Sequence, residues 1–240
     1  MQINTSLKPA DLARWLKDND VVTEIYGTKG HYQLIQRTSD ILRLMLNESL
    51  VDLTDLENIW AATERHDNES KLYTYKTLEE ISTALKSDHL EFLVQKIQEI
   101  PTKDLIKEHI NLINELTKYP MRGGRSAYMS AELLWEICIS DDSSAVVSEL
   151  VLNNFCELMK MWDLRSNRIN VLIKCVEKIR ENQSTRKCLV VITKILGHLP
   201  KVTTPNDPYT KDTAIEKLVN EQDLFPAFFN NIRHFKEASI

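Results

Sequence analysis

Residues 102–119 read TKDLIKEHINLINELTKY, and this stretch sets the interpretation of the whole chain. Its apolar residues recur three or four positions apart, which places them on one face of a helix of about four turns. The hydroxyl of Thr102 stands where it can cap the first turn. Pro120 ends the helix, because the residue before a proline is held away from helical geometry. The apolar stripe consists of Leu105, Ile106, Ile110, Ile113 and Leu116.

The same spacing of apolar residues recurs along most of the chain. Only five glycines and seven prolines occur among 240 residues, which favours long, uninterrupted helices. Residues 54–57, Thr-Asp-Leu-Glu, fit a capping box, and the polar run 141–144 can cap the helix that follows it. No segment alternates between apolar and polar residues, so no strand is predicted. Further helices are expected near residues 31–47, 54–65, 87–100, 126–140, 144–162, 167–182, 184–198, 210–220 and 224–236.

Successive helices with short connections pack antiparallel, and a series of such pairs stacks into an α-solenoid. We therefore predict an all-α fold, an α-solenoid of antiparallel helix pairs of the armadillo or HEAT kind, with about 10–11 helices. It would form a single helical-repeat region over residues 1–240, with a proline-containing loop at about 199–210. No literal repeat period is visible, as is common for degenerate units of this kind.

The composition argues against several classes of protein. The formal net charge is −5 and the pI about 5.7, without the concentrated basic residues of nucleic-acid-binding modules. No apolar run approaches the roughly 18 residues needed to cross a bilayer. Residues 1–7 lack the basic start and apolar segment of a secretory signal. We expect no nucleic-acid binding and no membrane span, and we expect the chain in the cytoplasm, with the nucleus as a second compartment.

Four cysteines each lie within an apolar helical pattern: Cys138, Cys156, Cys175 and Cys188. No two of them form a C-x-x-C pair, so the pattern indicates buried free thiols in a reducing compartment. A zinc site needs closely spaced pairs of ligands, whereas the six histidines are scattered singly. No metal and no cofactor are predicted.

No catalytic motif is visible in the chain. A nucleophile is presented on a strained turn or a helix start beside a base, whereas these cysteines fall in the middle of helices. The motifs G-x-S-x-G, H-E-x-x-H and the P-loop are all absent. No catalytic residue is predicted. A helical enzyme with an unrecognised site is the least favoured hypothesis, because no cluster of titratable residues converges.

A candidate contact for an anion or an acidic peptide lies just before the helix expected at 126–140. Arg122 and Arg125 flank Gly123 and Gly124. Lys118 is nearby. Backbone N–H groups at a glycine-rich helix start attract anions, so the three basic side chains are a candidate partner contact. A flexible, solvated joint is the simpler interpretation, because two glycines are far fewer than a P-loop has.

Residues 55–62 read Asp-Leu-Glu-Asn-Ile-Trp-Ala-Ala, and this stretch resembles part of the N-terminal helical-repeat region of the fat facets-type large ubiquitin-specific proteases. Further stretches match the same region in the same order. They are Trp15–Lys17, Arg37–Leu42, Leu133–Trp135, Ser140–Asp142, Thr204–Pro205 and Tyr209, with the helix that begins at Lys211. The similarity covers most of the chain and is weaker over about 67–120 and 163–198.

The resemblance implies an armadillo-like, non-catalytic scaffold or protein-interaction region of a cysteine deubiquitinase, a ubiquitin carboxyl-terminal hydrolase. Its partners would be proteins: the rest of the parent protease, and ubiquitinated substrates or adaptors recruited for removal of ubiquitin. The family's catalytic cysteine and histidine boxes have no match here, so no cysteine of this chain inherits a catalytic role. The alternative is a stand-alone helical-repeat adaptor protein unrelated to deubiquitination. The reading frame past Ile240 separates the two hypotheses.

The last predicted helix has an unusually wide apolar face. Its apolar residues spread over an arc of roughly 140°, wider than the 100° or so of a helix that buries one side only. In a solenoid, an internal repeat buries one face on each of its two neighbours. We therefore expect an internal repeat with an exposed apolar patch. The residues are Leu224, Phe225, Phe228, Phe229, Ile232 and Phe235.

Overall fold

The computed structural model describes residues 8–27, 31–65, 67–118, 124–160, 164–200 and 209–238. Within these ranges the chain forms fourteen α-helices and no strand, so the predicted all-α fold is confirmed. The first eight are α1 (Pro9–Asp18), α2 (Val21–Tyr26), α3 (Tyr32–Ile35), α4 (Ser39–Asn47), α5 (Leu53–Ala61), α6 (Asn68–Ile81), α7 (Ser87–Gln98) and α8 (Lys107–Thr117). The remaining six are α9 (Gly124–Ile139), α10 (Ala145–Leu158), α11 (Arg165–Arg180), α12 (Thr185–His198), α13 (Lys211–Glu216) and α14 (Leu224–Ala238).

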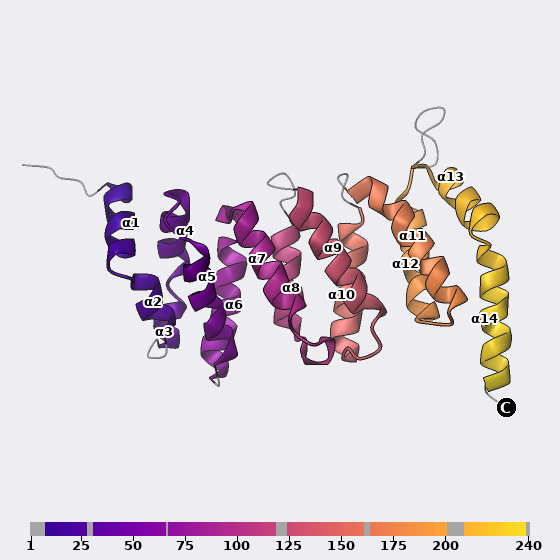
Figure 1. Cartoon of the computed structure of the whole chain (residues 1–240), viewed down its shortest axis with the longest axis horizontal. Helices are drawn as coiled ribbons and strands as arrows, with labels where there is room; N and C mark the ends of the chain where they lie inside the picture. Colours follow the sequence, from indigo (N-terminus) through magenta and orange to yellow (C-terminus); the bar gives the residue numbers. More distant parts are fainter. Residues whose placement is uncertain are drawn as a thin grey trace, which may run out of the picture. The chain divides into compact units, whose positions relative to one another are not determined.

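The chain divides into two compact units. Unit 1 comprises Met1–Ile100 with Ile106–Ala127, and unit 2 comprises Pro101–Leu105 with Tyr128–Ile240. In unit 1, α1 packs on α2 and α4, α2 on α5, α3 and α4 on α6, α5 on α7, and α8 on α6 and α7 (Figure 1). In unit 2, α11 packs on α12 and α14, and α12 packs on α10 and α13. Contacts between helices that are close along the chain are those of stacked helical repeats.

Each unit buries its own apolar core. In unit 1, Trp60 exposes only 4% of its surface and meets the ring of Tyr75 edge-on. In unit 2, Trp135 exposes 5% and packs on the fully buried Phe155. The predicted apolar stripes therefore face the interior. Side chains with no exposed surface include Ile35, Met45, Leu56, Ile59, Leu78, Leu93, Ile110, Val151 and Leu172.

The helix predicted over 102–119 begins later than expected. Thr102–Asp104 form a short 3-10 turn, and α8 starts at Lys107, so the prediction that Thr102 caps this helix is wrong. The backbone N–H of Ile106 instead donates to Nδ1 of His109 at 3.1 Å. A buried imidazole in the first turn thus satisfies the backbone group in front of the helix. The predicted apolar stripe is nevertheless largely buried.

The capping box of α5 lies two residues earlier than the predicted pair of Thr54 and Glu57. The carboxylate of Asp52 accepts the backbone N–H groups of Thr54 and Asp55, at 2.9 and 3.0 Å. The carboxylate of Asp55 accepts the N–H of Asp52 at 2.9 Å. From α1, Lys17 places its Nζ 2.9 Å from Asp52 Oδ2 and 2.7 Å from Asp55 Oδ2. This cation favours a box of two carboxylates, because its positive charge lies against both and offsets their mutual repulsion.

The helix predicted over 31–47 is divided into α3 and α4 by a turn at Thr38. The Thr38 hydroxyl donates to the carbonyl of Ile35 at 2.8 Å and lies 2.6 Å from the hydroxyl of Tyr26. Both Thr38 and Tyr26 are 2% exposed. Hydrogen bonds from a threonine side chain to nearby backbone compete with helix formation, which explains the break.

Helices α1, α2 and α6 lie outside the predicted segments. The inner face of α6 includes Ser70, Thr74 and Thr77 besides Leu78 and Ile81. The hydroxyl of Thr74 is satisfied by the carbonyl of Ser70 at 2.7 Å. Because buried hydroxyls interrupt the apolar spacing, periodicity does not reveal this helix. The fourteen helices of the described ranges therefore exceed the predicted number.

Most of the later helices lie where they were expected. Helices α7, α9, α11 and α12 agree within two residues at each end with the segments predicted at 87–100, 126–140, 167–182 and 184–198. Ser144 caps α10, because its hydroxyl accepts the N–H of Val147 at 3.3 Å, but α10 ends at Leu158 rather than near residue 162. The predicted proline loop falls mainly on 201–208, outside the described residues.

The last helix exposes the apolar patch that its sequence predicts. Phe225, Phe229 and Ile232 expose 54%, 57% and 47% of their surface, and we call these three residues the α14 stripe. Phe228 is half-buried. The side chain of Phe235 lies outside the described part of the chain.

Candidate binding groove

The three basic residues predicted as a partner contact do not form a described cluster. Lys118 follows α8, and its ammonium forms an ion pair with Glu115 one turn earlier. Arg122 lies outside the described residues. Arg125 belongs to α9, but its side chain lies outside the described part. A contact through these residues stays a prediction.

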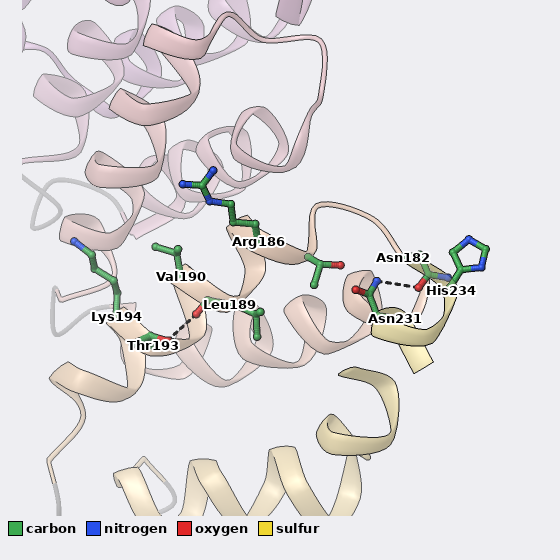
Figure 2. Close-up of a pocket in the computed structure, with 9 residues that line it drawn as sticks. Asn182, Arg186, Leu189, Val190, Thr193, Lys194, Asn231 and His234 are labelled. Atoms are coloured by element: carbon green, nitrogen blue, oxygen red, sulfur yellow. Dashed lines mark hydrogen bonds between the residues drawn. The ribbon is translucent and has the colours of Figure 1, made fainter. Parts of the chain in front are cut away.

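An open hollow lies in unit 2, between α12 and α14. It has a volume of about 720 Å³, and we call it the α12 groove (Figure 2). Helix α12 supplies most of its surface, through residues three or four positions apart on one face. These residues are Arg186, Leu189, Val190, Thr193 and Lys194.

The amphipathic sequence of α12 fixes which face lines the groove. Cys188, Val191, Ile192 and Ile195 are buried, on the side where α12 packs against α10 and α11. At about 100° per residue, the groove residues fall on the opposite side of the same helix. The groove is therefore lined by the side of α12 opposite its buried face.

A hydrogen bond between two asparagines closes one end of the groove. Nδ2 of Asn231, on α14, donates to Oδ1 of Asn182 at 2.8 Å, and Figure 2 shows this bond beside His234. Asn182 adopts a left-handed conformation with φ of 59°, which asparagine tolerates better than most residues. Nearby, Arg180 donates to the carbonyl of Gln222 at 2.9 Å. The asparagine bond ties α14 to the turn between α11 and α12, and the arginine bond ties the end of α11 to the segment just before α14.

A second hollow of about 500 Å³ lies between α12 and α10. Arg186 and Val190 line both hollows. Helix α10 contributes Glu149, Leu152 and Asn153, among others. The exposed face of α12 thus borders two hollows of the same unit.

The groove is basic within an acidic chain. Residues 184–199 contain no Asp or Glu, although the chain carries a net charge of −5. Arg186 and Lys194 are exposed, and neither forms an ion pair within the described residues. Lys187 donates to the carbonyl of Ser140 at 2.9 Å. Among the described residues that line the two hollows, Glu149 is the only acid.

The four cysteines are not placed for nucleophilic chemistry. All are free and buried, as predicted, and they lie on α9, α10, α11 and α12. Burial raises the pKa of Cys138 to about 12, and it also raises the pKa of Cys156 and Cys175. A hydrogen bond from Cys175 lowers the pKa of Cys188, but that thiol has no exposed surface. The attacking species of a cysteine enzyme is an accessible thiolate, which these residues do not provide.

Two further features of the described ranges bear on function. No group of three or more His, Cys, Asp and Glu side chains is placed to hold a metal ion there. No helix there combines the length and apolar character that crossing a membrane requires.

Residues 1–239 match the family model of the UBP24/USP9X/USP9Y ARM repeat. The chain belongs to this family. It is 22% identical to ubiquitin carboxyl-terminal hydrolase 9X of Mus musculus over 242 residues, which are 95% of this chain and 9% of that protein. It is 22% identical to hydrolase 9Y of Homo sapiens over 177 residues, which are 71% of this chain and 7% of that protein. The ARM-repeat chain therefore spans less than a tenth of the length of these relatives.

Family membership confirms the predicted helical solenoid and the resemblance to large ubiquitin-specific proteases. The groove of this ARM-repeat chain does not follow from sequence motifs, because its lining joins α12 to Asn231 and His234, more than thirty residues further along the chain. One signal was available in the sequence, namely the absence of acidic residues between 184 and 199.

Proposed function

We propose that this chain is a non-catalytic protein-binding scaffold of a large ubiquitin-specific cysteine protease, where it recruits substrates or adaptors for removal of ubiquitin. The observation that carries the proposal is the match of residues 1–239 to the ARM repeat of such proteases. ARM-type solenoids offer long rigid surfaces to other proteins, and the α12 groove is a surface of that kind.

The chemistry of the described residues supports a binding role. The α12 groove has an apolar floor together with basic and amide groups, which suit recognition of another chain. The cysteines are enclosed in the core. We place the chain in the cytoplasm or nucleus, and its four unpaired thiols support a reducing compartment.

The absence of catalysis is tested with ubiquitin that carries an electrophile at its C-terminus. We expect no covalent adduct with the purified chain, whereas mouse hydrolase 9X should be labelled under the same conditions. Labelling of any of the four cysteines at one adduct per chain would overturn the non-catalytic assignment.

The recruitment role is tested in the full-length protein that contains this chain. Deletion of residues 8–238 should leave the hydrolysis of a small ubiquitin–fluorophore conjugate unchanged and slow the deubiquitination of protein substrates several-fold. Equal loss of both activities would show that the region supports the catalytic domain instead. A reading frame that ends at Ile240 would favour a stand-alone adaptor and contradict the proposal.

A further inference from the structure

We propose that the α12 groove binds an extended, acidic peptide segment of a partner protein, with an apolar side chain seated between two carboxylates. The inference rests on the binding role proposed above and adds the chemistry of the partner. It is carried by the charge, the floor and one closed end of the groove.

The charge of the groove selects an acidic ligand. Arg186 and Lys194 stand on the same face of α12 and form no ion pair within the described residues. Among the described residues that line the α12 groove there is no Asp or Glu. The guanidinium of Arg186 can hold a carboxylate through two parallel hydrogen bonds, and Lys194 can hold a second one as a point charge. In an acidic chain, a groove with this charge is complementary to negative side chains rather than to positive ones.

The floor of the groove requires an apolar group as well. Leu189 and Val190 lie between the two cations along α12, and both are half-exposed. Thr193 turns its hydroxyl to its own helix, donating to the carbonyl of Leu189 at 2.8 Å. The hydroxyl proton is therefore used within the helix, and the floor between the two cations is mainly apolar. An aliphatic side chain would remove this surface from water.

The two asparagines at the closed end favour an extended backbone. Within the described residues, the Asn182–Asn231 pair uses only one N–H and one oxygen, which leaves the amide nitrogen of Asn182 and the side-chain carbonyl of Asn231 for a ligand. An extended segment presents free backbone N–H and C=O groups to such amides, whereas a helix has already paired its own.

The geometry of α12 also sets the spacing of the ligand's acids. Arg186 and Lys194 are eight positions apart, which corresponds to about 12 Å along a helix axis. An extended peptide advances about 3.3 Å per residue, so acids four positions apart would reach both cations. A helical ligand would need acids about eight positions apart.

The test measures fluorescence anisotropy of labelled peptides with the whole chain. The probe GEVLVEG places two glutamates four positions apart around an aliphatic centre, and its valines disfavour a helix. We expect it to bind, and to bind more weakly as salt is raised. The charge-reversed peptide GKVLVKG and the respaced peptide GEEVLVG should bind at least tenfold more weakly. Equal binding of all three peptides would overturn the proposal.

Variants of the chain locate the binding site. Arg186→Glu with Lys194→Glu should weaken binding of GEVLVEG at least tenfold, and Val190→Asn should weaken it several-fold. These side chains are exposed or half-exposed, so circular dichroism should show an unchanged helical spectrum. The matched control is Lys76→Glu with Lys103→Glu, which makes the same change in net charge at exposed positions outside the groove. An equal effect of the control pair would overturn the proposal.

Two other occupants would be revealed by the same variants. If a ten-nucleotide thymidine strand competes with the peptide at similar concentration, the groove recognises polyanions and the peptide proposal fails. If the groove variants instead abolish self-association, the occupant is a second copy of the chain. If GEVLVEG does not bind and the electrophilic ubiquitin also fails to label the chain, the proposed groove ligand is wrong but the proposed function stands. Labelling by that probe rejects the proposed function whatever the peptides do.

Discussion

The buried imidazole of His109 caps α8 only while it is neutral. Its Nδ1 accepts the N–H of Ile106, so the proton of the neutral ring lies on Nε2, 2.5 Å from the hydroxyl of Tyr75. Burial lowers the pKa of His109 from 6.5 to about 4. A proton on Nδ1 would place the N–H of the ring against the N–H of Ile106, and their hydrogen bond would be lost. His89 has the same place in α7, accepts the N–H of Lys86 at 3.5 Å, and burial likewise lowers its pKa.

We therefore expect His109 to make the fold sensitive to acid. The unfolded chain binds this proton near pH 6.5 and the folded chain only near pH 4, so the stabilisation is complete above pH 6.5 and is lost as the pH falls to 4. His109→Gln keeps an oxygen that can accept the N–H of Ile106 but cannot titrate. In urea unfolding, the wild type should lose about 3 kcal/mol relative to this variant between pH 7.5 and pH 4. If the unfolding free energies of the wild type and the variant differ by the same amount at both pH values, His109 is not the acid-sensitive group.

Ser130 lowers the stability of the fold for a reason that only the structure reveals. It is 1% exposed, and its hydroxyl has no hydrogen-bond partner within the described residues. An unsatisfied buried hydroxyl costs about 1–3 kcal/mol, so Ser130→Ala should leave the free energy of unfolding unchanged or raise it by about 1 kcal/mol. The matched control is Ser144→Ala, which removes the cap of α10 and should lower it by about 1 kcal/mol. Equal losses for both variants in urea titrations would refute this view of Ser130.

Lys17 joins helix α1 to the start of α5. Its ammonium contacts Asp52 and the mostly buried Asp55 at the same time. Lys17→Met keeps the aliphatic length of the side chain but leaves the Asp55 carboxylate without its cation. We expect this change to lower the free energy of unfolding by about 1–3 kcal/mol and to increase amide hydrogen exchange in α1. The double variant Lys17→Met with Asp55→Asn should recover part of the loss. No loss in the single variant would mean that solvent screens the contact completely.

Helices were predictable from the sequence where their buried face consists of apolar residues at helical spacing. The segments at 87–100 and 184–198 bury aliphatic residues at helical spacing, and the structure places α7 and α12 there. Helix α6 escaped because Ser70, Thr74 and Thr77 occupy its inner face. The caps of α5 and α8 were misplaced because they depend on partners distant in sequence, Lys17 for one and Tyr75 for the other. The α12 groove depends in the same way on α14, which periodicity cannot place against α12.

Within unit 2, helix α14 presents two different surfaces. Asn231 and His234 face the α12 groove, while the α14 stripe lies on another side of the helix, at about 100° per residue. The three stripe residues are spaced like the buried side of an ordinary helix, yet half of their surface meets water. In an array of repeats, such a face is covered by a neighbouring helix.

We therefore expect the isolated chain to self-associate through the α14 stripe as its concentration rises, because burial of this surface is favourable. Phe229→Ser with Ile232→Ser should shift sedimentation velocity toward the monomer and leave the melting temperature unchanged, since neither side chain is enclosed by its own unit. The matched control is Val146→Ser, at a side chain that is 68% exposed and lies on α10. Single exposed apolar residues are common on protein surfaces, so this variant should associate like the wild type. A chain that stays monomeric at high concentration would show that the stripe tolerates water. A fall in melting temperature of the double variant would show that the two side chains support the fold of unit 2 itself.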